Sequence, residues 1–589
     1  MRRRTPVVVG LAAALALGAA TPALAAPGGP RPGGPGSPGH DANSLDLTLL
    51  ATTDVHGRVF DWDYFRDAPS AEPLGLARAA GAIDSVRAEQ GADSVLVVDN
   101  GDFLQGTPLT YRAAQDDPAA EHPMAAAYDA VGYDAQVVGN HEFNYGLDTL
   151  AGYTADVDHP VLGANVVDAA TGEPALQPYT LQRMHVPGHK PVTVGVLGLT
   201  TPGSAIWDRD NVTGLEFQNM VTAAQRWVPE VAAQADVVVV LSHAGVGGTS
   251  SYGPGTPTEN PTDEIARTVP GIDVMVVGHS HRDVPEQRVV NEVTGESVLL
   301  TQPYRYGASV SRVDLDLQKT RGQWDVVSTT ASSLRSADYA PSERVLDAVR
   351  AAHEDTVAYV NQVVATSTEE LSAATSRYED TPILDFIAQV QAETVDAALE
   401  GTPQADLPVL SVAAPFSRDA VFPQGDVTIR DIAGLYVYDN TLQAVELTGA
   451  QVRDYLEQSA TYFAQAPATG DVDPASLAGA GGTPDYNYDV LSGVTYDIDV
   501  SRPAGDRITR LETAAGPVAD DDRFVVAVNN YRRSGGGGFP HVSTAPVVYD
   551  QQLEIRQLLI DWASARGVID PADFAEQNWQ LVRGGVPLG

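Results

Sequence analysis

The chain has 589 residues, a length that predicts about two to four domains. Its 43% hydrophobic and 19% charged residues can build packed cores, which argues against disorder along the whole chain. The formal net charge of −41 argues against a nucleic-acid binder, because such a surface repels phosphate backbones. The absence of cysteine excludes disulfide scaffolds, cysteine nucleophiles and iron–sulfur sites.

The N-terminus has the features of an export signal. Three arginines at positions 2–4 precede an apolar stretch at 7–20, and Ala23-Leu24-Ala25 offers a small-x-small cleavage site. A transmembrane anchor is the alternative, but the apolar stretch is short for one and a Pro/Gly-rich segment follows it. We therefore expect a cleaved signal peptide at 1–25, a disordered spacer at 26–44, and an unanchored protein outside the cell or in the cell envelope.

From residue 45 to about 317, short apolar runs alternate with amphipathic, Ala-rich segments. This pattern predicts the strands and helices of a layered α/β domain, which we place at residues 45–335. The strands are expected at 45–50, 94–98, 135–138, 192–197, 236–241 and 272–277.

The second half of the chain predicts a different kind of domain. A continuous helical pattern at 342–363 indicates a linker, which we place at 336–363. Residues 364–589 mix helical and strand patterns and predict an α+β domain. Helices are expected at 384–399, 427–435 and 449–460, strands at 409–412 and 524–528, and a surface loop at 466–483.

Polar residues follow five of the predicted strands of the first domain. A single such residue is most simply an ordinary polar residue leaving a strand, but five in order favour a site, because ligands bind at the carboxyl ends of strands in α/β sheets. Five of the 12 histidines lie at these positions, and we expect the others, His353 among them, at the surface. The residues at the strand ends are Asp54, His56, Asp102, Asn140, His141, His243, His279 and His281.

These residue types suit a pair of metal ions. Imidazole, carboxylate and amide ligands together favour divalent ions such as Mn, Zn, Fe or Co. Two ions about 3.5–4 Å apart activate water at neutral pH and clamp an in-line phosphoryl displacement. They also supply the positive charge that an acidic chain lacks.

The order D-x-H, G-D, G-N-H-E, H and G-H-x-H resembles the calcineurin-like metallophosphoesterases. Over the whole mature chain the sequence resembles their two-domain 5′-nucleotidase family, and within it the bifunctional 2′,3′-cyclic-nucleotide 2′-phosphodiesterase/3′-nucleotidases. The resemblance implies a four-layer α/β/β/α sandwich followed by an α+β substrate domain. The resembling stretches lie at 52–65, 98–109, 139–147, 410–419, 435–442, 486–500 and 528–536.

The resemblance also implies a ligand set for two ions. One ion would be held by Asp54, His56 and His281, and the other by Asn140, His243 and His279. Asp102 would bridge the two ions.

His141 follows a ligand directly, and the resemblance implies that it faces the substrate and stabilises phosphoryl charge or helps the leaving oxygen depart. Support of Asn140 is the alternative. In plain 5′-nucleotidases an Asp orients this histidine, but here the position holds Asn144. An amide can hold the imidazole by a hydrogen bond, but it cannot stabilise an imidazolium as a carboxylate would. The F-N-Y-G context of Asn144 instead resembles the cyclic-phosphodiesterase branch.

The substrate domain carries candidates for binding a nucleoside. Tyr438 and Tyr531 resemble the two aromatic residues that stack the base, each contact being worth about 1–3 kcal/mol; an ordinary core or surface tyrosine is the alternative for each. The Gly-rich segment after Tyr531 lacks the Lys of a Walker-type loop, so we expect it to let the backbone approach the nucleoside. The further candidates for substrate contact are Arg418, Arg532, Arg533, Ser534, Gly535 and Gly536.

Together these features predict a secreted dimetal phosphoesterase that hydrolyses 2′,3′-cyclic nucleotides to 3′-nucleotides, and these to nucleoside and phosphate. A 5′-nucleotidase or nucleotide-sugar hydrolase is the alternative that shares every ligand. A non-catalytic surface binding module is the alternative of a different class, and the intact ligand set argues against it. The expected partner is a small nucleotide rather than a nucleic-acid polymer, and the oligomeric state is left open.

Overall fold

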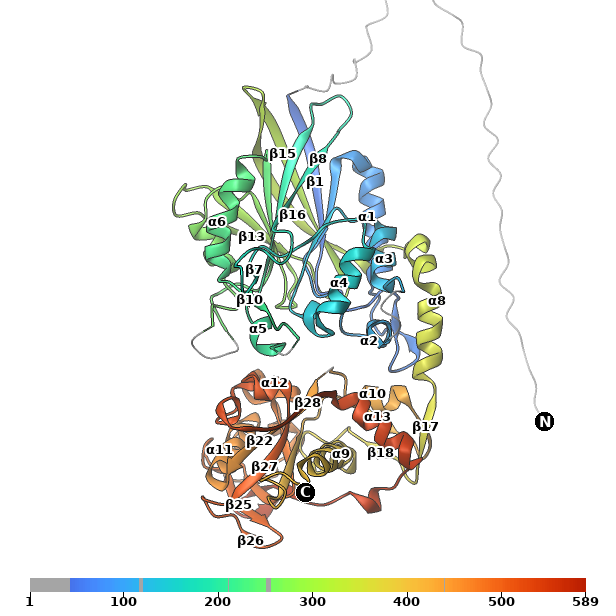
Figure 1. Cartoon of the computed structure of the whole chain (residues 1–589), viewed down its shortest axis with the longest axis vertical. Helices are drawn as coiled ribbons and strands as arrows, with labels where there is room; N and C mark the ends of the chain where they lie inside the picture. The colour runs from blue at the N-terminus through green and yellow to red at the C-terminus, as the bar shows by residue number, and fades with distance from the viewer. Residues whose placement is uncertain (1–42, 116–119, 210, 251–255, 439, 589) are drawn as a thin grey trace, which may run out of the picture. The chain divides into compact units, whose positions relative to one another are not determined.

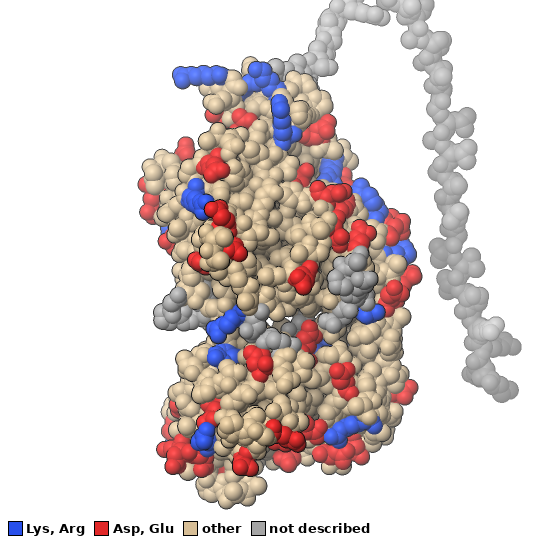
Figure 2. Space-filling view, viewed as in Figure 1, with Lys and Arg blue, Asp and Glu red and all other residues tan. Residues whose placement is uncertain are grey.

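The computed structural model describes residues 43–115, 120–209, 211–250, 256–438 and 440–588. The expected signal peptide and nearly all of the spacer lie outside the described residues. Within the described part of the chain, no helix combines the length and the apolar character needed to cross a bilayer. Acidic side chains are scattered over the face shown in Figure 2, with basic side chains between them, in keeping with the net charge of −41.

Two six-stranded sheets form the centre of the first domain (Figure 1). The first sheet has the order β16-β15-β1-β4-β5-β6 and the second the order β13-β14-β12-β11-β9-β8. The first consists of β1 (Ser44–Thr52), β4 (Val95–Asp99), β5 (Ala135–Val137), β6 (Val161–Leu162), β15 (Ser309–Thr320) and β16 (Gln323–Arg335). The second consists of β8 (Tyr179–Met184), β9 (Val192–Thr200), β11 (Val237–His243), β12 (Val274–Val277), β13 (Val284–Val290) and β14 (Ser297–Gln302).

Alternating side chains of the strands fill two different cores. Leu49 of β1 packs in the cluster between the sheets, together with Val196 and Val239, whereas its neighbour Leu50 packs in the cluster under the helices. This follows from the two-residue period of a strand, which sends successive side chains to opposite faces. Helices cover the outer face of each sheet, so the expected four-layer α/β/β/α arrangement is confirmed. The covering helices are α1 (Leu76–Gln90), α3 (Pro123–Val131), α4 (Gly146–Asp156), α6 (Met220–Ala232) and α7 (Thr262–Thr268).

Parallel pairing brings the carboxyl ends of the predicted strands to one edge. Strand β1 pairs in parallel with β4, and β11 pairs in parallel with both β9 and β12. All six predicted strands are present within a few residues of their expected bounds. The segments that leave β1, β4, β5, β11 and β12 at this edge carry the candidate ligands.

Helix α8 (Glu343–Val360) follows the first domain and packs against α1 and α3. Its His353 is half-buried: the ring stacks on Phe60 at 4.0 Å, and the Nδ1 lies 2.8 Å from the hydroxyl of Tyr64. The prediction that the remaining histidines lie at the surface is therefore wrong for His353, and also for the buried His122 and His159. Aromatic partners far away in the sequence account for the burial of His353.

The second domain is built on a sheet of order β23-β19-β27-β22-β28, packed against helices, so the expected α+β character is confirmed. A capping box at Thr448 and Gln451 starts α11, as the predicted helix at 449–460 requires. The helix expected at 427–435 begins later, because Val427 and Thr428 pair in β21 (Gly425–Thr428). The elements are α9 (Pro382–Leu399), β19 (Val409–Ala413), α10 (Ile429–Leu435), β22 (Thr441–Thr448), α11 (Gly449–Ser459), β23 (Val490–Ser492), β27 (Arg523–Asn529), β28 (Val547–Glu554) and α13 (Ile555–Arg566).

Gly81 lies in the middle of α1, where this helix closely approaches the backbone of the segment before α8. Ala is normally favoured over Gly inside a helix by about 0.5–1 kcal/mol. At Gly81, however, a Cβ would collide with the carbonyl oxygen of Ala340. We therefore expect Gly81→Ala to lower the free energy of unfolding by about 1–3 kcal/mol in urea denaturation. Gly434→Ala in α10 is the control, because its Cβ would meet only Phe65 at 3.7 Å. An unfolding free energy of Gly81→Ala at or above that of wild type would contradict the prediction.

Candidate metal centre

The polar residues that follow the predicted strands lie together at the shared edge of the sheets. They form two overlapping groups of side chains, and within each group the possible ligand atoms lie within 4.8 Å of one another. Because Asp102 belongs to both groups, its carboxylate stands where a bridge between two ions is required. The first group holds Asp54, His56, Asp102 and His281, and the second holds Asp102, His243 and His279.

The backbone is strained at most of these positions. Five of the residues have φ between 50° and 63°, the left-handed region that non-glycine residues seldom adopt. Such conformations cost about 1–3 kcal/mol each and persist where the surroundings fix them, often at functional sites. The five residues are Asp54, His56, Asp102, His279 and His281.

Protein acceptors orient the imidazole rings of the cluster. His56 Nδ1 donates to the carbonyl of Gln105 at 2.9 Å, and His243 Nδ1 donates to the carbonyl of Asn100 at 2.6 Å. Both rings are left with Nε2 as the ligand atom, the arrangement found in metal-binding histidines. His279 differs: its Nε2 lies 2.8 Å from a carboxylate oxygen of Glu259, which leaves Nδ1 for a metal.

Two buried atoms of the cluster fit a cation. Asn140 Oδ1 is buried and makes no hydrogen bond within the protein, and the buried His243 Nε2 faces only a carboxylate oxygen of Asp102, at 3.0 Å. Buried polar atoms are seldom left in this state, because the lost solvation costs free energy. Asn140 Oδ1 can only accept, so a positive ion suits it. Asn140 is thus the seventh candidate ligand, beside the six residues of the two groups.

The pKa values of the cluster show how it is charged without an ion. Burial lowers the pKa of His56 to about 3, which keeps its imidazole neutral, as a metal ligand must be. Burial also opposes a charge on His243, but Asp102, whose Oδ2 lies 3.0 Å from His243 Nε2, raises the pKa of His243 to about 10. A proton on His243 thus balances the buried carboxylate, and a divalent cation would take its place.

Glu142 fixes the loops that carry Asp102 and Asn140. Its carboxylate is 1% exposed and accepts four backbone N–H groups at 2.5–3.0 Å. These bonds tie the segment after β4 to the segment after β5. Sequence reasoning treated Glu142 only as part of the G-N-H-E motif, although an acid directly after two site residues was a signal for such a role. The four donors belong to Asp102, Phe103, Leu104 and Gly139.

His141 lies beside the metal-binding candidates and is held by a polar chain. Its backbone N–H donates to Asp102 Oδ1 at 2.8 Å, and its Nδ1 lies 2.6 Å from Asn144 Oδ1. The amide nitrogen of Asn144 in turn donates to Asp208 Oδ1 at 2.7 Å. Burial opposes a charge on His141, but Asp102, Asn144 and Asp208 together raise its pKa. A carboxylate, Asp208, thus lies behind Asn144 and acts on His141 only through that amide.

Tyr438 stands among aromatic neighbours. It is 39% exposed, and its ring lies 5.4 Å from Phe416 and 6.0 Å from Tyr486. Burial and then the nearby phenols of Tyr486, Tyr306 and Tyr531 raise the pKa of Tyr438. Tyr306 is also 5.7 Å from the ring of His56, so its ring lies beside the metal-binding candidates.

Arg532 does not face a ligand site. Its side chain is 1% exposed, and Nε and Nη2 donate to the carboxylate of Asp489 at 2.7 and 2.9 Å. The backbone carbonyls of Tyr486 and Gly536 and the side chain of Asn487 accept its remaining N–H groups. We therefore correct the expected substrate contact: Arg532 holds the segment beside Tyr531 in place.

The other predicted substrate contacts lie nearer the surface. Arg418 is largely exposed and pairs with Asp485 at 2.5 Å. Gly535 has φ 103°, which suits only glycine, and a Cβ on Gly536 would overlap the ring of Tyr531. The two glycines thus let this segment turn and pack closely on the tyrosine.

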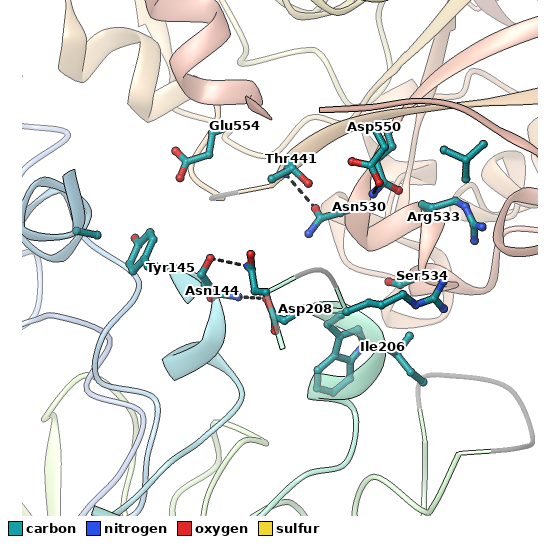
Figure 3. A pocket seen from close by; sticks show the side chains of 16 residues that line it. Asn144, Tyr145, Ile206, Asp208, Thr441, Asn530, Arg533, Ser534, Asp550 and Glu554 are labelled. Carbon is teal, nitrogen blue, oxygen red and sulfur yellow. Dashed lines mark hydrogen bonds between the residues drawn. The ribbon is translucent and has the colours of Figure 1, made fainter. Parts of the chain in front are cut away.

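A cavity of about 280 Å³ is lined by residues of both domains (Figure 3). Asn144 and Asp208 lie on one side of it, and Arg533, Ser534 and Asp550 lie on the other. Two of the predicted substrate-binding residues therefore share a cavity with the polar chain behind His141.

Arg305 is a further basic group at the metal-binding candidates, and sequence reasoning did not find it. Its Nη1 lies 3.0 Å from His281 Nδ1, and its guanidinium lies 4.6 Å from the ring centre of Tyr306. No motif marks this arginine, because it approaches His281 only through the tertiary structure. It places positive charge at the edge of the cluster.

Comparisons with known proteins bear on both halves of the chain. The family described as calcineurin-like phosphoesterase matches residues 47–283, and the family described as 5′-nucleotidase, C-terminal domain matches residues 363–544. A 2′,3′-cyclic-nucleotide 2′-phosphodiesterase/3′-nucleotidase of Yersinia enterocolitica is 33% identical over 92% of this chain and 88% of its own length. A trifunctional nucleotide phosphoesterase of Bacillus subtilis is also 33% identical over 92% of this chain, but the chain spans only 39% of that protein.

A solved structure of a Staphylococcus aureus protein assigned as a 5′-nucleotidase, in complex with alpha-ketoglutarate, covers both domains. It is 26% identical and superposes with a TM-score of 0.72 over 91% of this chain and 100% of its own. The arrangement of two domains in one chain is therefore shared with a solved structure.

Replacing Glu142 by Gln tests its role in holding the loops. One of the two acceptor oxygens would become an NH₂ group that faces backbone N–H donors. We expect Glu142→Gln to lower the free energy of unfolding of the metal-free protein by about 1.5–3 kcal/mol, as hydrogen bonds to a charged group are worth this much. Urea denaturation in the presence of a chelator gives the value. Glu173→Gln is the control, since the same change occurs there at an exposed side chain. Equal stability of the two variants would show that the four hydrogen bonds contribute little.

Proposed function

Because this chain belongs to the two-domain 5′-nucleotidase family of calcineurin-like phosphoesterases, we propose that it hydrolyses 2′,3′-cyclic nucleotides to 3′-nucleotides, and these to nucleoside and phosphate. The observation that carries the proposal is the double cluster of carboxylate and imidazole groups around Asp102. The name of the 33% identical relative from Yersinia enterocolitica supports the choice of substrate.

The proposed ligand set divides the cluster between two ions, with Asp102 as the bridge. Two divalent ions bound there, of Mn, Zn, Fe or Co, supply Lewis-acid charge to the phosphate and activate water as the nucleophile. Because backbone carbonyls accept from Nδ1 of His56 and His243, the Nε2 atoms of both rings remain available to bind metal. The ligands would be Asp54, His56 and His281 for one ion and Asn140, His243 and His279 for the other.

His141 and Asn144 are proposed to serve the leaving group. When water attacks phosphorus in line, the bond from phosphorus to the 2′-oxygen breaks and that oxygen must be stabilised or protonated. Asn144 holds Nδ1 of the His141 ring and thereby leaves Nε2 to face the phosphate. The product is a 3′-nucleotide, whose phosphate is removed in a second hydrolysis at the same site.

Residues of the second domain are proposed to bind the nucleoside. Tyr438 and Tyr531 would stack the base, which suits their aromatic surroundings. Contacts to the ribose or phosphate would come from Arg418, Arg533, Ser534, Gly535 and Gly536.

Export and domain limits are further parts of the proposal. The arginines, apolar stretch and small-x-small site at residues 1–25 support a cleaved signal peptide and a location outside the cytoplasm. We place the catalytic domain at 45–335, the linker at 336–363 and the nucleotide-binding domain at 364–589. The family matches at 47–283 and 363–544 fit within these limits, give or take one residue.

A 5′-nucleotidase is the second candidate, because the solved structure of similar fold has that assignment. It would use the same ligands and the same tyrosines. The two activities differ in the position of the phosphate on the ribose and in the cleavage of the cyclic diester, so substrate comparison decides between them.

The purified mature protein with Mn²⁺ should turn over 2′,3′-cyclic AMP and 3′-AMP faster than 5′-AMP. Asp102→Asn should reduce kcat/KM at least about 100-fold, because the bridging charge is lost. The exposed Asp93→Asn is the control. Preference for 5′-AMP would favour the second candidate, and no turnover of the three nucleotides would contradict both.

Removing either tyrosine should weaken nucleotide binding. We expect Tyr438→Ala and Tyr531→Ala each to raise KM for 3′-AMP by about 5- to 150-fold, the equivalent of 1–3 kcal/mol of stacking, with a smaller effect on kcat. Tyr438→Phe and Tyr531→Phe keep the ring and should retain the wild-type KM. Unchanged KM values in both alanine variants would remove these residues from the substrate site.

A further inference from the structure

We propose that Asp208 is a positioning residue for His141 and acts on it through Asn144. Figure 3 shows Asn144 and Asp208 side by side, with a hydrogen bond between them. Asp208 follows α5 (Ser204–Trp207), and its side chain is 5% exposed. The consequence for catalysis rests on the proposed function, whereas the consequence for the ring of His141 does not.

The chemistry of the three side chains determines which way each one points. A carboxylate can only accept, so Asp208 requires the NH₂ group of Asn144 to face it, at 2.7 Å. The amide oxygen of Asn144 must then face His141, whose Nδ1 lies 2.6 Å away. Two acceptors cannot share this contact, so His141 Nδ1 must carry a proton. Asp208 thus fixes a proton on Nδ1 of an imidazole that it does not touch.

The surroundings keep this chain in one arrangement. Asn211 Nδ2 donates to the backbone carbonyl of Asn144 at 2.8 Å and so holds the residue from its other side. The backbone carbonyl of Asp208 accepts the N–H of Asn211 at 2.9 Å. Burial raises the pKa of Asp208 to about 6, so at neutral pH the ionised, accepting form prevails.

The direction of the His141 ring matters for the proposed reaction. With Nδ1–H donated to the amide oxygen of Asn144, Nε2 is the atom left to face the leaving oxygen, and it donates to that oxygen when the ring carries a proton on both nitrogens. If Asn144 turned its NH₂ group towards His141, Nδ1 would have to become the acceptor, and the ring could no longer carry both protons. An isolated asparagine can adopt either orientation, and only its next neighbour decides between them.

An exchange of amide and carboxylate between positions 144 and 208 tests this role with almost no change in shape. In Asp208→Asn the constraint on Asn144 is lost, and kcat should fall at least about 10-fold while KM stays within about 2-fold. In the double variant Asn144→Asp/Asp208→Asn, the carboxylate at 144 accepts from His141 Nδ1 directly and from the new amide. We expect this variant to recover most of the lost kcat.

Nitrogen NMR of the histidine-labelled, Zn²⁺-loaded protein gives a readout that does not depend on turnover. His141→Gln identifies the signals of His141. We expect Nδ1 of His141 to carry a proton in wild type, a mixture of protonated and bare Nδ1 in Asp208→Asn, and a protonated Nδ1 again in the double variant. The exposed Asp93→Asn should match wild type in both measurements.

The two measurements separate the failure of this proposal from the failure of the proposed function. An unchanged protonation of His141 Nδ1 in Asp208→Asn would overturn the role of Asp208, whatever the substrate. A double variant that stays a mixture would overturn it as well, because the carboxylate at 144 should suffice. If wild type hydrolyses none of the nucleotides but the protonation of Nδ1 responds as expected, the proposed function fails and the role of Asp208 stands.

Discussion

The buried carboxylate of Asp102 is the constraint on which the site depends. Asp102 is 1% exposed, and burying its ionised carboxylate costs several kcal/mol unless opposite charge and hydrogen bonds compensate. His243 supplies the nearest positive charge, and Glu142 fixes the backbone that carries Asp102. The same segment holds two other strained positions, since Asp54 N–H donates to the carbonyl of Gly101 and His56 N–H donates to the carbonyl of Asp102, each at 2.8 Å. Because the net charge is −41, the chain as a whole offers an anionic substrate little attraction. The positive charge that binds such a substrate must therefore be local, at the cluster around Asp102.

The sequence predicted the strands and the residues at their ends because both follow from short-range rules. Alternating apolar residues predict a strand, and parallel strands place their carboxyl ends together. Glu142 and Asp208 escaped this reasoning because their partners are fixed by the tertiary structure: Asp208 lies 64 residues from Asn144. The expectation for Arg532 failed for the same reason, because Asp489, the buried carboxylate with which Arg532 pairs, lies 43 residues away. Short-range patterns thus predict where a polar residue lies in the fold, whereas its role depends on a partner that is distant in the sequence.

Two buried acids, Glu142 and Asp208, therefore affect the site indirectly, through the groups that they hold. Glu142 accepts only backbone N–H groups, so it determines where the ligands stand but not how they are protonated. Asp208 accepts from the side-chain amide of Asn144 and so controls which way that amide faces His141. The first acts on geometry and stability, whereas the second acts on the state of His141. This difference follows from the donors alone: a backbone N–H cannot turn round, but an amide group can.

Some of the contacts that connect the two domains are of a kind that holds weakly. Arg66 and Asp419 form an ion pair between largely exposed side chains. The buried Tyr111 also donates to Gln557 of the second domain at 2.9 Å. Exposed ion pairs contribute about 0–1 kcal/mol, much less than the packed core within each domain. The cavity beside Asn144 and Asp208 is nevertheless lined from both domains. A substrate bound there would contact both sides, so binding would strengthen a domain contact that the side chains alone hold loosely.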